Sequence, residues 1–372
     1  MQWVISWRDG TVAGVRGEWA GGVELDVDLT EPAGGQNRVR ALAYPALVGA
    51  PRVGDRVSLN VSALVRGLGT GGYAMVVALP DRLPPDPVPG PGHVVKARYT
   101  PLQPMVLGVD EQESPWHEQL READDLAAMP VVVADLHSAV PAVLAGARAA
   151  AVRGGQAAPR VVYVMSDGAA LPLAFSRSVA ALRQAGWLAG TITAGQAYGG
   201  ELEAVNVHTA LLAARVVLAA DIAVVTQGPG NLGTGTRWGF SGVAAGEAIN
   251  AAAVLGGRPV AALRVSQADP RERHCGISHH SMTAYGRVAL RGADVVTLAG
   301  PQEPWPLVRR QAGELCAPGL HRLVELPADG LREALETVPV RLSTMGRGLA
   351  EDPAAFLASA AAGAHAAGLT AT

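Results

Sequence analysis

From residue 131 onward, the sequence alternates apolar, β-rich runs with segments of helical pattern. Runs such as Val131–Ala134, Val161–Met165 and Ile222–Thr226 are almost entirely apolar, and each precedes a stretch with helical spacing. A strand that is apolar on both sides has to be covered on both faces, as in a parallel sheet whose crossover connections are helices. The pattern therefore predicts an α/β domain with a doubly wound, mainly parallel sheet.

The same pattern gives the expected order of elements in this domain. The expected strands cover residues 131–134, 161–165, 191–194, 222–226, 259–265, 295–298 and 340–343. Helices are expected up to residue 151, near 176–185 and 207–219, up to 256–257, near 281–290, and from Asp352-Pro353, a pair typical of a helix start.

Before this domain, short β-like runs are separated by glycines. They cover residues 11–15, 23–29, 39–44, 56–60 and 73–79. Several short strands at such spacing predict a small β-rich, barrel-like domain. The segment PPDPVPGPG at residues 84–92 has the composition of a linker. We therefore divide the chain into a β domain at 1–82, a linker at 83–95 and the α/β domain at 96–372.

Composition narrows the environment and the partners. A formal net charge of -3 gives no general attraction to phosphate backbones, which disfavours nucleic acid as a partner. Two cysteines are too few for a disulfide framework, and no apolar run is long enough to span a membrane. We expect a cytoplasmic protein with a small-molecule ligand and no membrane partner, and a homo-oligomer remains open.

Candidate site residues come from the ends of the expected strands, because ligands of open parallel sheets bind outside the carboxyl ends of the strands. Asp135 and His137 follow the first strand, and Gln196 follows the third. Alternate side chains of a strand end share one face, so Asp135 and His137 can act as an orienting carboxylate and its base, or share a metal. A structural role for His137 fits the sequence equally well.

The longest strand-end segment is a glycine-rich loop within the strand, loop and helix of residues 222–255. Glycine amides can converge on an anion, and the following helix N-terminus adds a favourable dipole. Gly228, Gly230 and Gly233 match G-x-G-x-x-G, but the glycine run continues and no Gly-Lys-Ser/Thr follows, which argues against a nucleotide loop. The alternative is a structural or interface loop. The candidate ligand-binding residues are Gly228, Gly230, Asn231, Gly233, Thr234, Thr236 and Arg237.

A second polar loop, residues 271–281, contains two arginines, three histidines and a thiol. Arg271 and Arg273 suit a carboxylate or phosphate, and His279 and His280 suit proton transfer. His274, Cys275, His279 and His280 are chemically able to bind a metal, but their spacing matches no standard zinc motif. We therefore assign no metal ligand, and a solvated or interface loop remains the alternative.

Four phrases of the sequence carry a resemblance to a known family: GLGTGGYAMVVALPDRLPPDP, VKARYTPLQ, QGPGNLGTGTRWGFSG and SHHSMTAYGR. Together they resemble an uncharacterised bacterial family, the domain of unknown function 3866. The resemblance covers almost the whole chain and implies no activity.

A more distant resemblance, over residues 96–233, is to the proproteins of glycine and proline reductases. It rests on the order of strands, on PRVVYV at 159–164, on TAGQ at 193–196 and on the turn at 228–231. In that family a cysteine becomes a pyruvoyl group after self-cleavage. Ala197 stands at that position here and has no nucleophile, so pyruvoyl chemistry is not implied. What the resemblance does imply is a fold that holds a small amino- or carboxylate-bearing ligand.

From these observations we expect an enzyme that binds a small anionic metabolite at the glycine-rich strand-loop-helix site. Asp135, His137, His279 and His280 are its candidate catalytic residues. The sequence identifies no cofactor and no substrate. The alternative is a non-catalytic metabolite-binding or assembly protein that uses its β domain as an interaction module.

Overall fold

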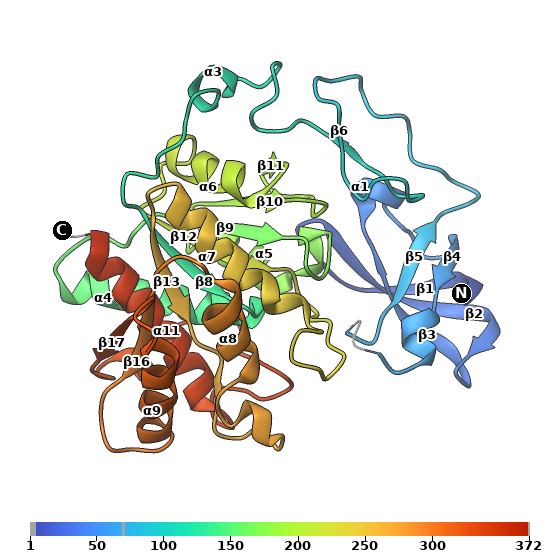
Figure 1. Cartoon of the computed structure of the whole chain (residues 1–372). Helices are drawn as coiled ribbons and strands as arrows, with labels where there is room; N and C mark the ends of the chain where they lie inside the picture. The colour runs from blue at the N-terminus through green and yellow to red at the C-terminus, as the bar shows by residue number, and fades with distance from the viewer. Residues whose placement is uncertain (1–4, 69–70, 371–372) are drawn as a thin grey trace. The chain divides into compact units, whose positions relative to one another are not determined.

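A computed structural model describes residues 5–68 and 71–370 of the chain (Figure 1). The chain divides into two compact units. The first holds the residues up to Gly90 together with Thr100–Pro104, and the second holds Pro91–Tyr99 and the residues from Met105 onward. Each unit has a hydrophobic core of its own.

The described part of the first unit is a closed barrel with the strand order β1-β2-β3-β5-β4. Its strands are β1 (Trp7–Trp19), β2 (Gly22–Ala33), β3 (Gln36–Ala43), β4 (Arg56–Asn60) and β5 (Ala74–Ala78). Neighbouring strands are antiparallel except β3 and β5, which are parallel. Leu25, Val27 and Leu59 belong to its buried core. The order and directions are those of an OB-type barrel, so the predicted β domain is confirmed as a barrel.

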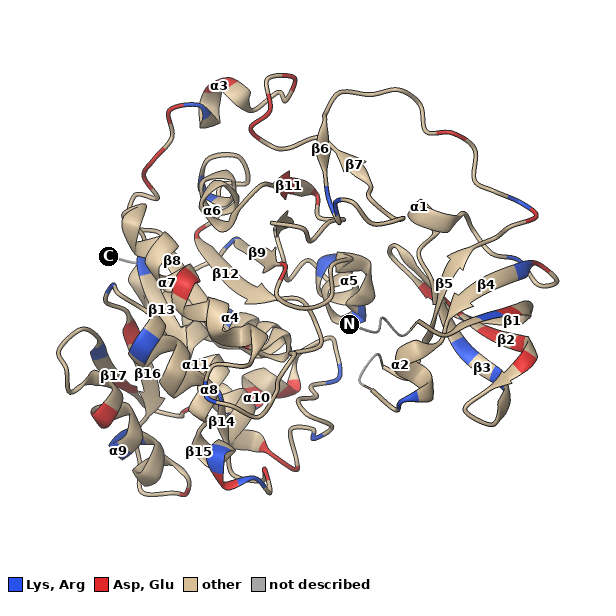
Figure 2. Ribbon diagram, turned by 45° about the vertical axis from the view of Figure 1, so that its right-hand side comes forward, with Lys and Arg blue, Asp and Glu red and all other residues tan. Residues whose placement is uncertain are grey.

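Charged side chains on the barrel are paired across its strands. Arg38 on β3 contacts Asp28 on β2, and Arg16 on β1 contacts Asp26 at 3.0 Å. Figure 2 shows the resulting basic and acidic bands side by side on these strands. Carboxylates that neutralise the arginines lower the positive potential that a phosphate backbone would need.

The second unit contains a parallel sheet with the order β11-β10-β9-β12-β8-β13-β16-β17 among the described residues. Every neighbouring pair in it is parallel. The strands are β8 (Pro130–Ala134), β9 (Val161–Ser166), β10 (Gly190–Ala194), β11 (Leu202–Ala204), β12 (Ile222–Gln227), β13 (Arg258–Ala262), β16 (Asp294–Leu298) and β17 (Arg322–Leu326).

Helices cover both faces of this sheet (Figure 1). Right-handed crossovers place α4, which leads from β8 to β9, and α7, which leads from β12 to β13, on opposite faces. The main helices are α4 (Val140–Arg153), α5 (Arg177–Gln184), α6 (Val207–Val216), α7 (Ala244–Val254), α9 (Trp305–Cys316), α10 (Leu331–Glu336) and α11 (Pro353–Thr370). The doubly wound α/β fold predicted from the sequence is therefore confirmed.

Shorter elements connect these layers. They are α1 (Pro45–Val48), α2 (Ser62–Val65), β6 (Val94–Val95), β7 (Met105–Val106), α3 (His117–Leu120), β14 (Val265–Ser266), β15 (Gly276–Ile277), α8 (His279–Thr283) and the turns η1 (His137–Ala139), η2 (Leu173–Phe175), η3 (Ser241–Val243), η4 (Glu272–His274) and η5 (Ala284–Val288). None of the helices in the described ranges is long and apolar enough to cross a membrane.

Two glycines allow α4 and α11 to cross in direct contact. A Cβ atom at Gly363 would lie 1.9 Å from the carbonyl oxygen of Val143, and one at Gly146 would lie 1.8 Å from that of Ala360. No side chain can occupy these positions unless the helices move apart. Glycine, otherwise unfavourable in a helix, is here a requirement of helix packing.

One predicted strand is wrong. Residues 340–343 are irregular in the structure and lead into a turn in which Thr344 and Arg347 form an isolated bridge. The last strand of the sheet is β17, which the sequence pattern does not predict. It lies at the edge of the sheet, and its residues are exposed or only partly buried, so it lacks the continuous apolar run that marks a central strand. The helix predicted from Asp352-Pro353 is confirmed as α11.

Candidate functional site

The parallel sheet brings the carboxyl ends of β8, β12 and β13 to one edge. Asp135 follows β8, Gln227 ends β12, and Arg264 lies two residues after the end of β13. The chain leaves β8 toward β9 and leaves β13 toward β16, so the connections of these two neighbouring strands run in opposite directions. A crevice at such a topological switch point is the usual ligand site of an open α/β sheet.

Asp135 is a buried carboxylate at this edge. Its Oδ2 has no hydrogen-bond partner among the described residues. The nearest charged groups are the guanidinium of Arg264, with Nη1 at 3.9 Å, and the ring of His280, with Nδ1 at 3.8 Å. Burial raises the pKa of Asp135, while the positive charge of Arg264 opposes that shift. A buried carboxylate oxygen without a donor is uncommon in native structures and asks for an explanation.

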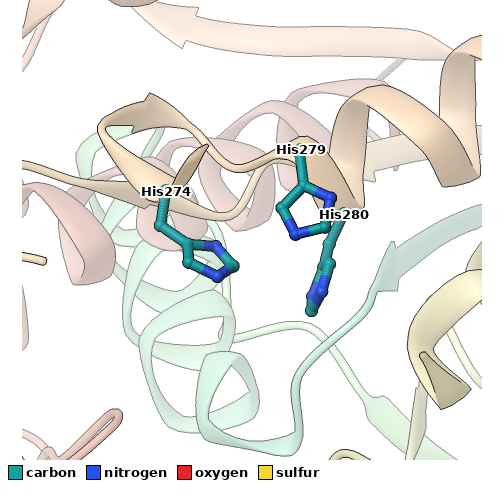
Figure 3. Close-up of side chains that lie close together, drawn as sticks. All are labelled: His274, His279 and His280. Carbon is teal, nitrogen blue, oxygen red and sulfur yellow. The ribbon is translucent and has the colours of Figure 1, made fainter. Parts of the chain in front are cut away.

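Three histidines from the 271–281 loop meet beside Asp135 (Figure 3). His274 lies in η4, and His279 and His280 begin α8, whose N-cap Ser278 accepts a hydrogen bond from the amide of His280. The same Ser278 hydroxyl lies 2.7 Å from Nδ1 of His274. One capping serine thus fixes both halves of the cluster, which we call the histidine cluster.

The rings of the cluster are closely packed and neutral at pH 7. Ring centroids are 4.4 Å apart for His279 and His280, and 5.0 Å for His274 and His279. Phe240 stacks on His280 at 3.9 Å. Burial lowers the pKa of His280 to about 3 and that of His274 to about 4, and it also lowers the pKa of His279. The positive charge of Arg264 lowers the pKa of all three.

The outer side of the cluster opens into a cleft with a volume of 640 Å³. His279 lines it together with Arg237, Arg273 and Arg287, and we call it the arginine cleft. Its other lining residues are Gly235, Met282, Thr283, Gly286, Glu314, Leu315 and Pro318. Arg237 comes from the glycine-rich loop and Arg273 from the 271–281 loop, so the structure brings the two predicted polar loops together. Figure 2 shows basic residues beside β15, the short strand of the second loop.

The glycine-rich loop folds back on itself before α7 begins. The amide of Thr234 donates a hydrogen bond to the carbonyl of Gly239 at 2.7 Å, and the amide of Ser241 donates one to the carbonyl of Leu232 at 3.0 Å. The hydroxyls of Thr234 and Thr236 lie 3.1 Å apart. These contacts occupy part of the polar groups that were predicted to surround an anion. The loop contributes Gly235 and Arg237 to the arginine cleft, whereas Gly228, Gly230, Asn231 and Gly233 do not line it.

Asp135 and His137 have different partners. The strand ends at Ala134 and His137 begins the turn η1, so the alternation of side chains that would place both on one face does not continue. Nδ1 of His137 lies 2.8 Å from the hydroxyl of Tyr163, and Nε2 lies 2.7 Å from that of Ser176. Both ring nitrogens are therefore engaged away from Asp135.

Gln196 and Arg271 are also bound within the protein. The side-chain oxygen of Gln196 accepts a hydrogen bond from the amide of Arg98 at 3.0 Å. Arg271 makes a two-pronged contact with Asp269, at 2.9 and 2.8 Å. Neither residue lines the arginine cleft.

A smaller cavity of 30 Å³ lies between the ends of β8 and β13. Asp135, Ser138, Arg264 and Arg347 are among its lining residues. Arg347 contacts Asp269 at 3.2 Å and the buried Asp352 at 3.1 Å. The cavity has room for water but not for a metabolite.

Two arginines of the site were not predicted. Arg264 lies inside the expected strand 259–265. The feature that could have marked it as a site residue is its charge, near the end of an otherwise apolar run. Arg287 follows the second polar loop by six residues. It reaches the cleft because α8 continues into the π-helical turn η5, which the sequence pattern does not indicate.

Comparison with protein families identifies this chain's family. A family model described as a protein of unknown function (DUF3866) matches residues 40–363. No curated protein and no solved structure matches the chain. The matched region includes the histidine cluster and the arginine cleft. It agrees with the first resemblance noted in the sequence and is silent on the reductase proproteins.

Proposed function

This chain belongs to the DUF3866 family, whose function is unknown, and we propose that it is an enzyme that acts on a small anionic metabolite in the arginine cleft. One observation carries the proposal. Arg237, Arg273 and Arg287 line one cleft, and none of these described side chains forms an ion pair or a hydrogen bond. Three guanidinium groups without carboxylate partners favour an anionic ligand.

The surroundings of these arginines also favour an anionic ligand. Elsewhere in the second unit, arginines such as Arg271 and Arg322 are paired with Asp269 and Asp294. In the cleft, Glu314 is the one carboxylate among the lining residues of the described chain. Guanidinium groups bind carboxylate and phosphate through two parallel hydrogen bonds, and the volume of 640 Å³ is that of a typical metabolite site. The ligand class is therefore a carboxylate or a phosphate.

His279 is what favours an enzyme over a binding protein. Its Nε2 is buried and has no partner in the described structure, and burial lowers its pKa, so the ring is neutral at pH 7. A neutral imidazole with a free ring nitrogen beside a ligand can accept a proton or bind a metal ion. The rival hypothesis, a non-catalytic metabolite-binding or assembly protein, requires neither.

The resemblance to reductase proproteins supports the ligand class and not the reaction. Ala197 stands where those proteins carry their reactive cysteine. It is buried, and its carbonyl accepts a hydrogen bond from Lys96 at 3.0 Å. We therefore look for the reaction at the arginine cleft.

A ligand screen with matched variants tests the binding part of the proposal. Carboxylate- and phosphate-bearing metabolites are screened by thermal shift, and hits are measured by calorimetry. Arg237→Ala, Arg273→Ala and Arg287→Ala should each weaken binding by about 10-fold or more, since a hydrogen bond to a charged group is worth about 1.5–3 kcal/mol. Arg341→Ala, which removes an exposed arginine outside the cleft, should leave affinity unchanged. Full affinity in the triple cleft variant would reject the site.

Catalysis is tested separately on the same hits. Each bound compound is incubated with the protein and followed by NMR, with His279→Ala as the comparison. Conversion that depends on His279 supports the enzyme. Ligands that bind but are never altered would support the rival hypothesis of a binding protein.

A further inference from the structure

We propose that His274, His279 and His280 form a binding site for a divalent transition-metal ion of the zinc class, with Asp135 as the carboxylate that orients the ring of His280. The metal site does not depend on the proposed function. Only the substrate class that we infer for it below rests on the arginine cleft.

The three histidine rings converge on one point. One ring nitrogen from each of the three histidines lies within 4.8 Å of the others. Figure 3 shows the rings grouped, with His274 from one segment and His279 and His280 from the start of α8. Nitrogen ligands around a tetrahedral zinc ion, at 2.0–2.1 Å from it, are about 3.3 Å apart. Small side-chain rotations would draw the nitrogens together.

Two buried polar atoms of the cluster and of Asp135 have no partner among the described residues, namely Nε2 of His279 and Oδ2 of Asp135. Oε1 of Gln227, at the end of β12, is a third such atom at this edge of the sheet. Such atoms are rare in native proteins, and an unoccupied ligand site is one physical reason for them. A metal ion would satisfy Nε2 of His279 directly.

The same ion would also give Asp135 its missing donor. At present Nη1 of Arg264 donates to Nδ1 of His280 at 2.9 Å, so the ring proton sits on Nε2. Metal binding at Nε2 moves that proton to Nδ1, which can then no longer accept from Arg264, so the guanidinium has to turn away from the ring. The N–H at Nδ1 then faces Oδ2 of Asp135, which lies 3.8 Å from Nδ1. A carboxylate that accepts from the outer nitrogen of a metal-bound histidine is the common arrangement in proteins. One ion thus accounts for the unpartnered atoms of His279 and Asp135.

Carboxylates lie close to the arginines around the histidine cluster. Arg264 and Arg271 bring positive charge to this region. Oδ2 of Asp135 lies 3.9 Å from Nη1 of Arg264, and Oδ2 of Asp269 lies 2.8 Å from Nη2 of Arg271. The carboxylates offset the charge that would otherwise repel a cation.

The last step deepens the proposed function. Three protein ligands with an open position are typical of catalytic zinc sites, and structural sites usually have four. Because His279 also lines the arginine cleft, the ion and an anion held in the cleft would lie against the same imidazole ring. The substrate class is then a carboxylate or phosphate ester that a metal ion can polarise.

The test uses the full chain without any metabolite. The purified protein is stripped with a chelator and titrated with Co²⁺, whose visible absorption reports nitrogen coordination, and zinc is then used to displace it. We expect one ion per chain. His274→Ala, His279→Ala and His280→Ala should each weaken binding by about 100-fold, and Asp135→Asn by about 10- to 100-fold. His208→Ala, which removes an exposed histidine on α6, should bind as the wild type does.

A wild-type measurement keeps the proposal falsifiable if a variant fails to fold. Co²⁺ should shift the imidazole NMR signals of three histidines in the unmodified protein. Unshifted signals, or full Co²⁺ affinity in a folded His279→Ala variant, would overturn the metal site. Ligand binding in chelator-treated protein, compared between wild type and Arg273→Ala, reports on the arginine cleft independently. Either site can therefore fail without the other.

Discussion

At the scale of single residues, His137 shows how a predicted catalytic histidine becomes a structural one. Its ring connects the hydroxyls of Tyr163 and Ser176, and burial lowers its pKa to about 4. Tyr163 in turn lies 2.9 Å from the hydroxyl of Thr226, so the ring belongs to a chain of hydrogen bonds at the ends of β8, β9 and β12. Such a ring stabilises the fold as long as it remains neutral.

This gives a pH-dependent prediction. The pKa of a histidine in the unfolded chain is about 6.5, so between that value and about 4 the unfolded state binds a proton that the folded state does not. Stability is therefore lost as pH falls through this window, by up to about 1.4 kcal/mol per pH unit from His137. Urea unfolding at pH 7, 6 and 5 should show a shallower decline in His137→Gln than in wild type. His208→Gln should keep the wild-type slope, and an equal slope in both variants would contradict the assignment.

The cleft residues show what the sequence reveals and what it does not. Arg237 and Arg273 could be predicted because each lies in a loop with an unusual concentration of polar residues. Their meeting could not, because chain order does not determine strand order in a doubly wound sheet. Asp135 was predicted for the same reason as the arginines, but the histidine nearest its Oδ2 is His280, far along the chain, and not His137. A position in a loop can be predicted, whereas a contact between loops requires the topology.

At the scale of elements, the close crossing of α4 and α11 predicts that two Gly→Ala substitutions on α11 change the free energy of unfolding in opposite directions. A glycine inside a helix is normally improved by alanine, by about 1 kcal/mol. Gly363→Ala should instead destabilise the protein by about 1–3 kcal/mol, because the new Cβ would lie 1.9 Å from the carbonyl oxygen of Val143. Gly368→Ala on the same helix has open space around the new Cβ and should be neutral or stabilising. The measurement is the free energy of unfolding in urea.

A shift in the same direction for both alanine variants would mean that the helices do not cross as closely as described. The comparison is informative because both changes carry the same gain in helix propensity. Neither glycine position could be interpreted from the sequence. Both lie in an alanine-rich run whose composition predicts a packed helix but does not say which of its faces meets α4.

Burial explains why the central strands could be predicted from the sequence and the edge strand β17 could not. Central strands such as β8 and β12 are buried on both faces, so their sequences are continuous apolar runs. The edge strand β17 is exposed or partly buried and carries Arg322 and Glu325, which interrupt the apolar run. Residues 340–343 have a β-like composition but find no partner strand. Composition reports burial, and pairing decides whether a segment becomes a strand.

At the scale of the whole molecule, the two hydrophobic cores share no residue. The barrel core uses residues between Val12 and Leu79, and the core of the second unit begins at Val109. Between them runs the proline-rich segment 83–92, in which the side chain of Val88 is 90% exposed. Independent cores joined by an exposed segment are the properties of separately folding units.

We therefore predict that subtilisin first cleaves the native chain at a border of this segment, before Leu83 or after Gly92, where exposed chain can enter a protease. Each bond inside 83–92 has a proline on one side and resists cleavage. A fragment that begins at Pro91 should remain folded, because every residue of the larger core lies within it. Mass spectrometry identifies the first cut, and circular dichroism follows the urea unfolding of the purified fragment, which should be cooperative. Tryptic digestion offers a control, since arginines occur throughout the chain and early tryptic cuts should still spare β8 to β13. A first cut inside that sheet, or a fragment that unfolds without a transition, would show that the second unit depends on the barrel for its stability.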